Sequence, residues 1–348
     1  MENKKKKFLS KVKYFSHRYF IVALNGMAIG LFASLIIGTI FSTLAKISFL
    51  EFLTPIASVL GANKPVYGAA IGAGIALALK HKPIVVVSSL AAASIAIEQG
   101  GGPLGAYFAG LVAAEIGGLI CGKTKLDIIL VPLGTILSGG IVAILTGKPI
   151  GIAMNWIGEV INTATNSQPL LMGIIIAVLV GMALTAPISS AAICISIGIN
   201  GIAAGAAAVG CCTQMIGFAI CSYKKNKLSG LLSVGFGTSM LQFTNIIRKP
   251  IVWLPTIIAS AILGPISTCL LKMVNTPAGA GMGTCGLVGQ FGAIEAMLGL
   301  NMKWYDILWQ IGLMHFVLPI ILVFAINYVF EKLNLINSDD YLLNREEF

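Results

Sequence analysis

Long apolar stretches alternate with short polar links along most of the chain. In the first half, the apolar stretches cover residues 20–45, 65–80, 83–98, 103–122 and 128–147. A helix needs about 20 predominantly apolar residues to cross the hydrocarbon core of a bilayer. The pattern therefore predicts five membrane-spanning helices in this half. The first stretch is too long for a signal-peptide core, so we expect it to be retained.

The second half is less regular. Its apolar segments cover residues 168–197, 201–222, 228–247, 250–272, 275–298 and 304–330. Residues 228–247 and 275–298 carry many glycines and polar side chains, which broken or re-entrant segments lining a cavity accommodate better than a lipid-facing helix. We therefore expect an all-α polytopic membrane protein with about ten transmembrane helices if both segments are re-entrant, or eleven if both cross.

Two further patterns bear on the architecture. Residues 49–60 and 150–165 alternate polar and apolar positions at helical spacing, which predicts amphipathic helices at the outer interface. The pattern GxNxxxxGAA occurs at 61–70 and again at 198–207. This echo favours two half-repeats, about 19–147 and 168–298, although coincidence among small residues is the alternative. Membrane transporters are commonly built from such repeats.

The distribution of charged residues predicts how the chain is oriented across the membrane. The formal net charge is +10, and the basic residues gather at the ends of apolar segments, as in Lys4–Lys7, Lys80–Lys82 and Lys224–Lys227. This is the positive-inside pattern, which predicts that these ends lie in the cytoplasm. We expect a basic cytoplasmic N-terminus (1–18), a transmembrane domain (19–335) and a cytoplasmic tail (336–348). The pattern gives no support to nucleic-acid binding.

Composition and motifs limit the kinds of functional site that the chain can contain. The chain is 57% hydrophobic and 10% charged, and its seven cysteines lie in or beside apolar segments without a metal-binding spacing. It contains no nucleotide-binding loop and no catalytic pairing. We therefore expect no metal, no cofactor and no catalytic residue. Neutral amides and hydroxyls dominate the membrane-depth polar groups, which suits a hydroxyl-rich neutral solute.

Glu295 is the strongest candidate for a substrate-binding residue. An ionisable group within a membrane segment is costly and is by default a functional hypothesis, here an acceptor for a substrate hydroxyl. The alternative is that Glu295 pairs with Lys303 near the outer interface. Pro277 ends regular structure in the same segment, so its backbone could face a polar ligand.

The other candidates have structural alternatives. Asn63 and Asn200 could cap helices, Glu115 could need only a buried partner, Gln242 could join helices, and His315 could be a packed core histidine. The remaining candidate substrate-binding residues are Thr238, Asn245, Asn275, Thr276, Thr284 and Gln290.

Four segments resemble one known family. They are NGMAIGLFASLIIGTI (25–40), GGPLGAYFAGLVAAEIGGLICG (101–122), TAPISSAAI (185–193) and NTPAGAGMGTCGLVGQFGAIEAM (275–297). They resemble the bacterial phosphotransferase-system EIIC-type membrane proteins of the second EIIC class, which include perfringolysin regulator-like proteins. The resemblance covers about residues 15–335.

The resemblance implies a sugar permease of the bacterial cytoplasmic membrane that forms a homodimer and translocates a carbohydrate while partner proteins phosphorylate it. In better-understood members a Glu in a Gly-Ile-Thr-Glu-Pro-like hairpin contacts the sugar. Here Gly292 and Glu295 match that motif, whereas its Thr and Pro are missing. Because Cys211 and Cys212 lie in an apolar segment and little chain follows the last span, we expect separate EIIA- and EIIB-type partners.

Two other functions stay open at this stage. A membrane sensor or regulator of gene expression is favoured by the family's regulator members and by the missing phosphorylation domains. An ion-coupled secondary transporter is favoured by Glu115, Glu295 and His315 as possible proton sites.

Overall fold

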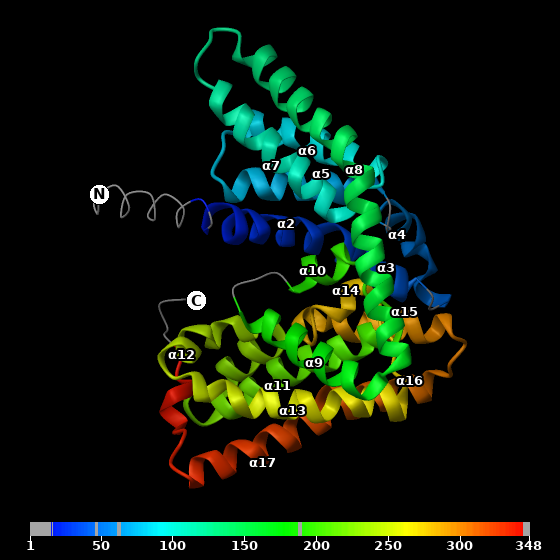
Figure 1. Cartoon of the computed structure of the whole chain (residues 1–348), viewed down its shortest axis with the longest axis vertical. Coiled ribbons are helices and arrows are strands. Elements are labelled where there is room, and N and C mark those ends of the chain that lie inside the picture. The colour runs from blue at the N-terminus through cyan, green and yellow to red at the C-terminus, as the bar shows by residue number, and fades with distance from the viewer. Residues whose placement is uncertain (1–14, 16, 46–47, 61–63, 187–189, 344–348) are drawn as a thin grey trace. The chain divides into compact units, whose positions relative to one another are not determined.

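Helices make up almost the whole structure (Figure 1). The computed structural model describes residues 15, 17–45, 48–60, 64–186 and 190–343. It is 86% helical, and the described residues contain no strand, only an isolated bridge between Gly201 and Asn275. The chain is an all-α polytopic membrane protein, which confirms the predicted fold class.

The chain divides into two compact units, residues 1–155 and 156–348. The elements that begin in the first unit are η1 (Arg18–Ala23), α2 (Leu24–Leu31), η2 (Phe32–Ile36), α3 (Ile37–Leu44), η3 (Ser48–Leu53), α4 (Thr54–Leu60), α5 (Pro65–Ala78), α6 (Pro83–Glu98), α7 (Gly102–Ile120) and α8 (Asp127–Ser167). The boundary between the units falls within α8.

Small residues let the helices of the first unit approach closely. Helix α5 packs on α2, α6 and α7. A Cβ added to Gly26 of α2 would lie 2.8 Å from the carbonyl carbon of Gly74 on α5, and one added to Gly72 would lie 2.9 Å from that of Ser89 on α6. Such backbone contact is the usual way for membrane helices to associate, because lipid offers no hydrophobic drive between them.

Helix α8 differs from the prediction. It runs for 41 residues without interruption through Pro132 and Pro149, so residues 128–147 and 150–165 belong to one helix rather than two. Proline removes one backbone hydrogen bond, but apolar surroundings favour keeping all the others intact. At about 1.5 Å per residue the helix is roughly 60 Å long. That is about twice the hydrocarbon thickness, so α8 cannot lie upright within the bilayer over its full length.

The second unit is arranged around α11. Its elements are α9 (Pro169–Thr185), α10 (Ser190–Ser196), α11 (Gly201–Leu232), η4 (Ser233–Gly237), η5 (Ser239–Gln242), α12 (Phe243–Arg248), η6 (Pro250–Trp253), α13 (Leu254–Pro265), η7 (Ile266–Leu271), α14 (Pro277–Ala280), η8 (Cys285–Leu287), α15 (Val288–Gly299), α16 (Trp304–Ile311), η9 (Gly312–Val317), α17 (Leu318–Lys332) and η10 (Ser338–Tyr341). Helices α9, α13 and α17 pack against α11 (Figure 1). The apolar part of α11 is 94% buried, so this helix is the core of the unit.

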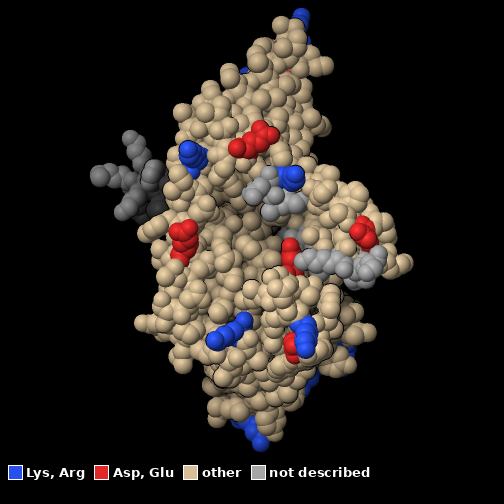
Figure 2. Space-filling model, turned by 90° about the vertical axis from the view of Figure 1, so that its right-hand side faces the viewer, with Lys and Arg blue, Asp and Glu red and all other residues tan. Residues whose placement is uncertain are grey.

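Among the described residues, six helical stretches are long and apolar enough to cross a membrane, one of them bent at Lys227, and five shorter apolar helices accompany them. The six are 18–42, 102–120, 127–167, 201–237, 250–271 and 304–332. The face drawn in Figure 2 carries few charged side chains, which stand singly or in small groups. Ten spans in total stays a prediction.

The predicted helix over 168–197 is wrong in one respect. Helix α9 ends at Thr185, Ala186 is extended (φ −70°, ψ 159°), and a separate helix α10 begins at Ser190. In the sequence Pro187 follows Ala186, and a residue before proline is sterically driven out of the helical region. The second unit therefore contains a third break in addition to the two that were predicted.

Candidate functional site

The segment 228–247 forms a hairpin. Lys227 is left-handed (φ 54°), and after it the chain continues to Thr238, whose extended backbone (φ −158°, ψ 138°) turns it back into η5 and α12. We refer to this segment as the inner hairpin.

Both ends of the inner hairpin lie at the same end of the unit. Lys225, just before it, has its Nζ 2.5 Å from Asp339 Oδ1. Lys249, just after it, has its Nζ 2.6 Å from Asp340 Oδ2. Because Asp339 and Asp340 are neighbours in sequence, the segment enters the unit and returns to where it began. The positive-inside rule predicts that this lysine-rich end is cytoplasmic.

Residues 275–299 form a second hairpin, the outer hairpin. It begins beside the start of α11, where the Asn275 N–H donates to the Gly201 carbonyl over 3.2 Å. It then returns through α15, and a Cβ added to Gly292 would lie 2.7 Å from Thr276 Oγ1. The outer hairpin therefore starts and ends at the end of the unit opposite to Lys225 and Lys249.

The tips of the two hairpins meet at the middle of α11. Thr284 Oγ1 donates to the Gly235 carbonyl over 2.5 Å, which joins the outer tip to the inner tip. Gly283 has a positive φ of 55°, and a Cβ there would lie 2.7 Å from the carbonyl carbon of Cys211. The break after α9 joins the same place, since Ser190 Oγ donates to the Gly281 carbonyl over 2.6 Å. Three breaks in helical structure thus converge on one point.

Gln214 of α11 organises one side of this meeting point. Its Oε1 accepts from Thr256 Oγ1 (2.8 Å) and Trp253 Nε1 (3.0 Å). Thr185 Oγ1, at the end of α9, lies 2.9 Å from Ser239 Oγ in the inner hairpin and 3.4 Å from the same Gln214 oxygen. Gln214 is fully buried, and its Nε2 has no hydrogen-bond partner among the described residues.

Gln290 and His315 form a second buried polar group. Gln290 Nε2 lies 3.0 Å from His315 Nδ1 and 3.5 Å from Cys212 Sγ. The amide donates to Nδ1, so a neutral imidazole carries its proton on Nε2. The exposed fractions of Gln290 and His315 are 6% and 0%. Within the described part of the chain, Gln290 Oε1 and His315 Nε2 have no partner.

These two groups leave buried hydrogen-bond donors and an acceptor unpaired. The meeting point holds buried donors on Gln214 and His315 and a buried acceptor on Gln290, none of them paired with another described residue. An unpaired buried polar group costs about 1–3 kcal/mol, which a bound polar ligand can recover. A hydroxyl both donates and accepts, so it suits this mixture. The described residues contain no cluster of His, Cys, Asp and Glu able to hold a metal ion.

Gln242 and Asn245, two predicted binding residues, are occupied elsewhere. Gln242 Nε2 donates to the Tyr341 carbonyl (3.1 Å), and Asn245 Nδ2 donates to Gln242 Oε1 (2.8 Å) and the Leu342 carbonyl (3.0 Å). Tyr341 itself is fully buried and donates to Asn327 Oδ1 over 2.6 Å. Burial raises the pKa of the Tyr341 hydroxyl. These amides therefore fasten the C-terminal segment to the inner hairpin.

Several other candidates also make local bonds. Thr276 and Thr238 accept from the backbone N–H of Gly279 and Met240, each over 3.2 Å, and so cap short helices. Asn275 Nδ2 donates to the Gly289 carbonyl over 3.0 Å, which holds the outer hairpin closed. Asn200 is exposed, and its side chain bonds Gly198 rather than capping α11.

Three candidates remain. Glu115 belongs to the first unit, where Arg18 Nη2 lies 2.7 Å from its Oε1. Glu295 is half-buried on α15 and takes part in an interaction within the protein. Asn63 lies outside the described residues. Of the twelve candidates, the structure thus brings Thr284, Gln290 and His315 to the hairpin tips and their surroundings.

The binding residues chosen from sequence omitted Thr185 and Ser190. The sequence contains a pattern that could have identified the break near Thr185. Thr185 lies two positions before Pro187, much as Thr276 lies just before Pro277. A polar residue beside a proline in an apolar segment marks a helix break whose backbone needs partners.

Comparison with known families agrees with this architecture. Residues 21–343 match the family described as "Phosphotransferase system, EIIC". Comparison with curated proteins gave no match.

Proposed function

The chain belongs to the EIIC family of the phosphotransferase system, and from this premise we propose where and how it handles its sugar. An EIIC protein is the membrane-embedded sugar-transport component of such a system. We place the carbohydrate where the two hairpin tips meet the middle of α11. Separate EIIA- and EIIB-type proteins would phosphorylate it at the cytoplasmic end.

The observation that supports this site most is the set of unpaired polar atoms around the tips. Gln214 Nε2, Gln290 Oε1 and His315 Nε2 are buried without partners among the described residues. Sugar hydroxyls supply both donors and acceptors, so they match these atoms better than an ion would. Hairpins entering from opposite ends also resemble the broken helices on which transporters commonly build their midplane sites.

Glu295 and Gln290 are alternative main contacts. Both lie on α15, but five positions separate them, which at about 100° per residue places them on different sides of that helix. Gln290 faces His315, whereas Glu295 follows the resemblance to sugar-contacting hairpins. We propose Gln290 as the first contact and keep Glu295 as the second. A homodimer in the bacterial inner membrane completes the proposal.

The test is sugar binding to detergent-purified protein, measured as a shift of the thermal unfolding midpoint across a carbohydrate panel. Wild type is compared with Gln290→Met and Glu295→Gln. A ligand that binds only the folded protein stabilises it by about 2.7 kcal/mol at 100 times its Kd. Loss of a hydrogen bond from Gln290 is expected to raise that Kd about tenfold or more.

Two control variants accompany the test. Glu159→Gln removes an exposed carboxylate on α8, and Thr165→Val removes a buried hydroxyl that bonds only within α8. Both should bind sugar like wild type. Stabilisation that persists in Gln290→Met but is lost in Glu295→Gln would move the contact to Glu295. No response to any sugar, together with no uptake in vesicles containing phosphotransferase partners, would contradict the proposal and favour a regulator.

A further inference from the structure

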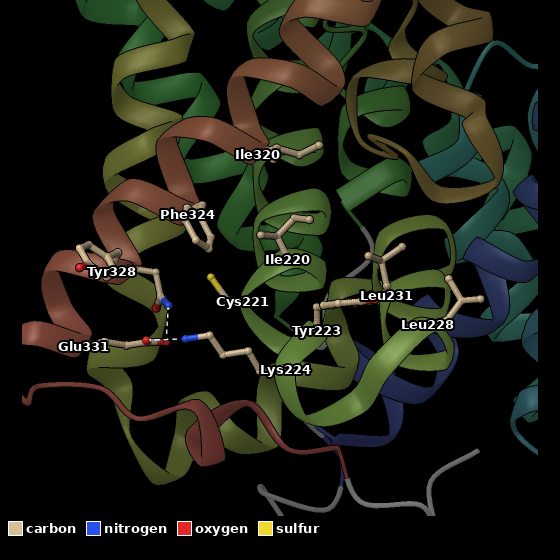
Figure 3. Close-up of a pocket in the computed structure, with 11 residues that line it drawn as sticks. Ile220, Cys221, Tyr223, Lys224, Leu228, Leu231, Ile320, Phe324, Tyr328 and Glu331 are labelled. Carbon is tan, nitrogen blue, oxygen red and sulfur yellow. Dashed lines mark hydrogen bonds and ion pairs between the residues drawn. The ribbon is translucent and has the colours of Figure 1, made fainter.

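A groove runs between α11 and α17 at the cytoplasmic end of the second unit (Figure 3). Its volume is about 580 Å³. One wall comes from α11 and the other from α17. The residues that line it along its apolar length are Ile220, Leu228, Leu231, Ile320, Phe324 and Tyr328.

The groove opens toward the outside of the unit. The exposed fractions of Leu228, Phe324 and Tyr328 are 62%, 54% and 49%. Large apolar side chains this exposed, in a helix bundle that spans a membrane, face lipid rather than water. The groove is therefore a recess in a lipid-facing wall, separate from the hairpin tips.

One end of the groove is closed by charges. Lys224 Nζ lies 2.8 Å from Glu331 Oε2, and Asn327 Nδ2 donates to the other oxygen of that carboxylate over 3.0 Å (Figure 3). Lys332 Nζ lies 5.0 Å from the centre of the Tyr328 ring, at the rim. Lys227, on α11, is exposed at the same end.

The carboxylates at this end already form ion pairs with lysines. Glu331, Asp339 and Asp340 each hold one lysine, namely Lys224, Lys225 and Lys249. Among the described residues, no carboxylate forms an ion pair with Lys227 or Lys332. Lys332 therefore stands unmatched at the rim of the apolar groove, at the level where the anionic head groups of the cytoplasmic leaflet lie. Lys227 instead lines a neighbouring pocket with Leu342 and Leu343.

We propose that this groove binds an anionic phospholipid, with one acyl chain between α11 and α17 and its phosphate at Lys332. The apolar lining matches the chain, and the unmatched lysine at the rim matches the charge. Basic pockets between membrane helices on the cytoplasmic side suit such head groups. This inference concerns a site distinct from the proposed sugar site and does not depend on it.

The experiment measures lipid binding to the delipidated, detergent-purified protein by native mass spectrometry. Dioleoyl phosphatidylglycerol is compared with dioleoyl phosphatidylcholine, and inorganic phosphate is tested alone. We expect tighter binding of the phosphatidylglycerol and no effect of phosphate. Lys332→Gln should weaken that preference about fivefold, because one lysine near a membrane contributes about a fivefold factor.

Matched variants separate the site from general effects. Leu228→Trp fills the exposed rim of the groove and should abolish tight binding of both lipids, whereas Leu232→Trp, on the same helix but outside the groove, should not. Lys303 also lies over a tyrosine ring, 5.5 Å from the centre of Tyr305, so Lys303→Gln is the control for charge. Equal binding of the two lipids, an unaffected Leu228→Trp, or an equal loss in Lys303→Gln would each overturn the proposal.

Discussion

Arg18, Glu115 and His81 meet at the basic end of the first unit. The Arg18 Nε and Nη2 lie 2.8 and 2.7 Å from Glu115 Oε1. His81 lies against Gly118 of the same helix as Glu115, and its Nε2 has no partner among the described residues. Glu115 thus pairs with a partly buried Arg18, as a charged residue in an apolar helix needs a partner.

These surroundings predict a pH dependence of stability. Burial lowers the pKa of His81 from its ordinary value of 6.5, with Glu115 opposing the shift and Arg18 adding to it. The unfolded chain therefore binds more protons as the pH falls below that value, and the folded protein loses stability between 6.5 and the lower folded pKa. Thermal unfolding between about pH 7.5 and 5 should show a shallower loss in His81→Gln than in wild type.

His17 supplies the control for this prediction, since it is exposed in the same unit. His17→Gln should lose stability on acidification as wild type does. An acid-induced loss that is the same in all three proteins would show that His81 has no part in it.

At the scale of elements, the two hairpins are held tip to tip by few contacts. Thr284 Oγ1 is buried and donates to the Gly235 carbonyl, the hydrogen bond recorded between the described residues of the two tips. Each hairpin is otherwise stabilised from its own end, the inner one by the C-terminal segment and the outer one by Asn275.

Replacing Thr284 with Val should loosen this junction. The change leaves the buried Gly235 carbonyl without a partner, which costs about 1–3 kcal/mol. In Thr165→Val, the Ile161 carbonyl keeps its helical bond to the residue 165 N–H, so about 0.5–1 kcal/mol is expected. Denaturant unfolding in detergent measures both. Equal losses in the two variants would mean that the tips do not depend on this bond.

Some elements could be predicted from sequence and others could not. The polar content of 228–247 and 275–298 predicted both hairpins, because unpaired polar groups are not tolerated against lipid. The break at Ala186 and the continuity of α8 were missed. Each depends on a single proline, and whether a proline ends a helix is decided by the partners that neighbouring helices offer to the freed backbone.

At the scale of the molecule, more basic residues flank the inner hairpin than the outer one. Lys224, Lys225, Lys227, Arg248 and Lys249 flank the inner hairpin, whereas Lys272 and Lys303 flank the outer one. Lys225 and Lys249 flank the inner hairpin and bind adjacent carboxylates of the C-terminal segment. The outer hairpin begins and ends away from them, beside Gly201. The positive-inside rule then predicts that the more basic end of the unit, at the inner hairpin, is cytoplasmic.

Cysteine labelling tests this topology. Ser229, Arg248 and Leu300 are exposed, so Ser229→Cys and Arg248→Cys should react with a membrane-impermeant maleimide only in inverted vesicles. Leu300→Cys should react in intact cells. Wild type provides the blank for the native cysteines. Reaction of Arg248→Cys from outside would mean that 228–247 crosses the membrane.

The sequence by itself determined that the chain is helical and membrane-embedded, which ends carry positive charge, and that two segments are broken. These properties follow from the composition of single segments, which responds to lipid and water wherever the segment packs. Only the tertiary structure decided that Gln290 lies beside His315, that Thr284 joins Gly235, and that Gln242 and Asn245 bind the C-terminal segment. Amides and hydroxyls bond equally well to a ligand or to backbone, so their role depends on which partner the fold brings within hydrogen-bonding distance.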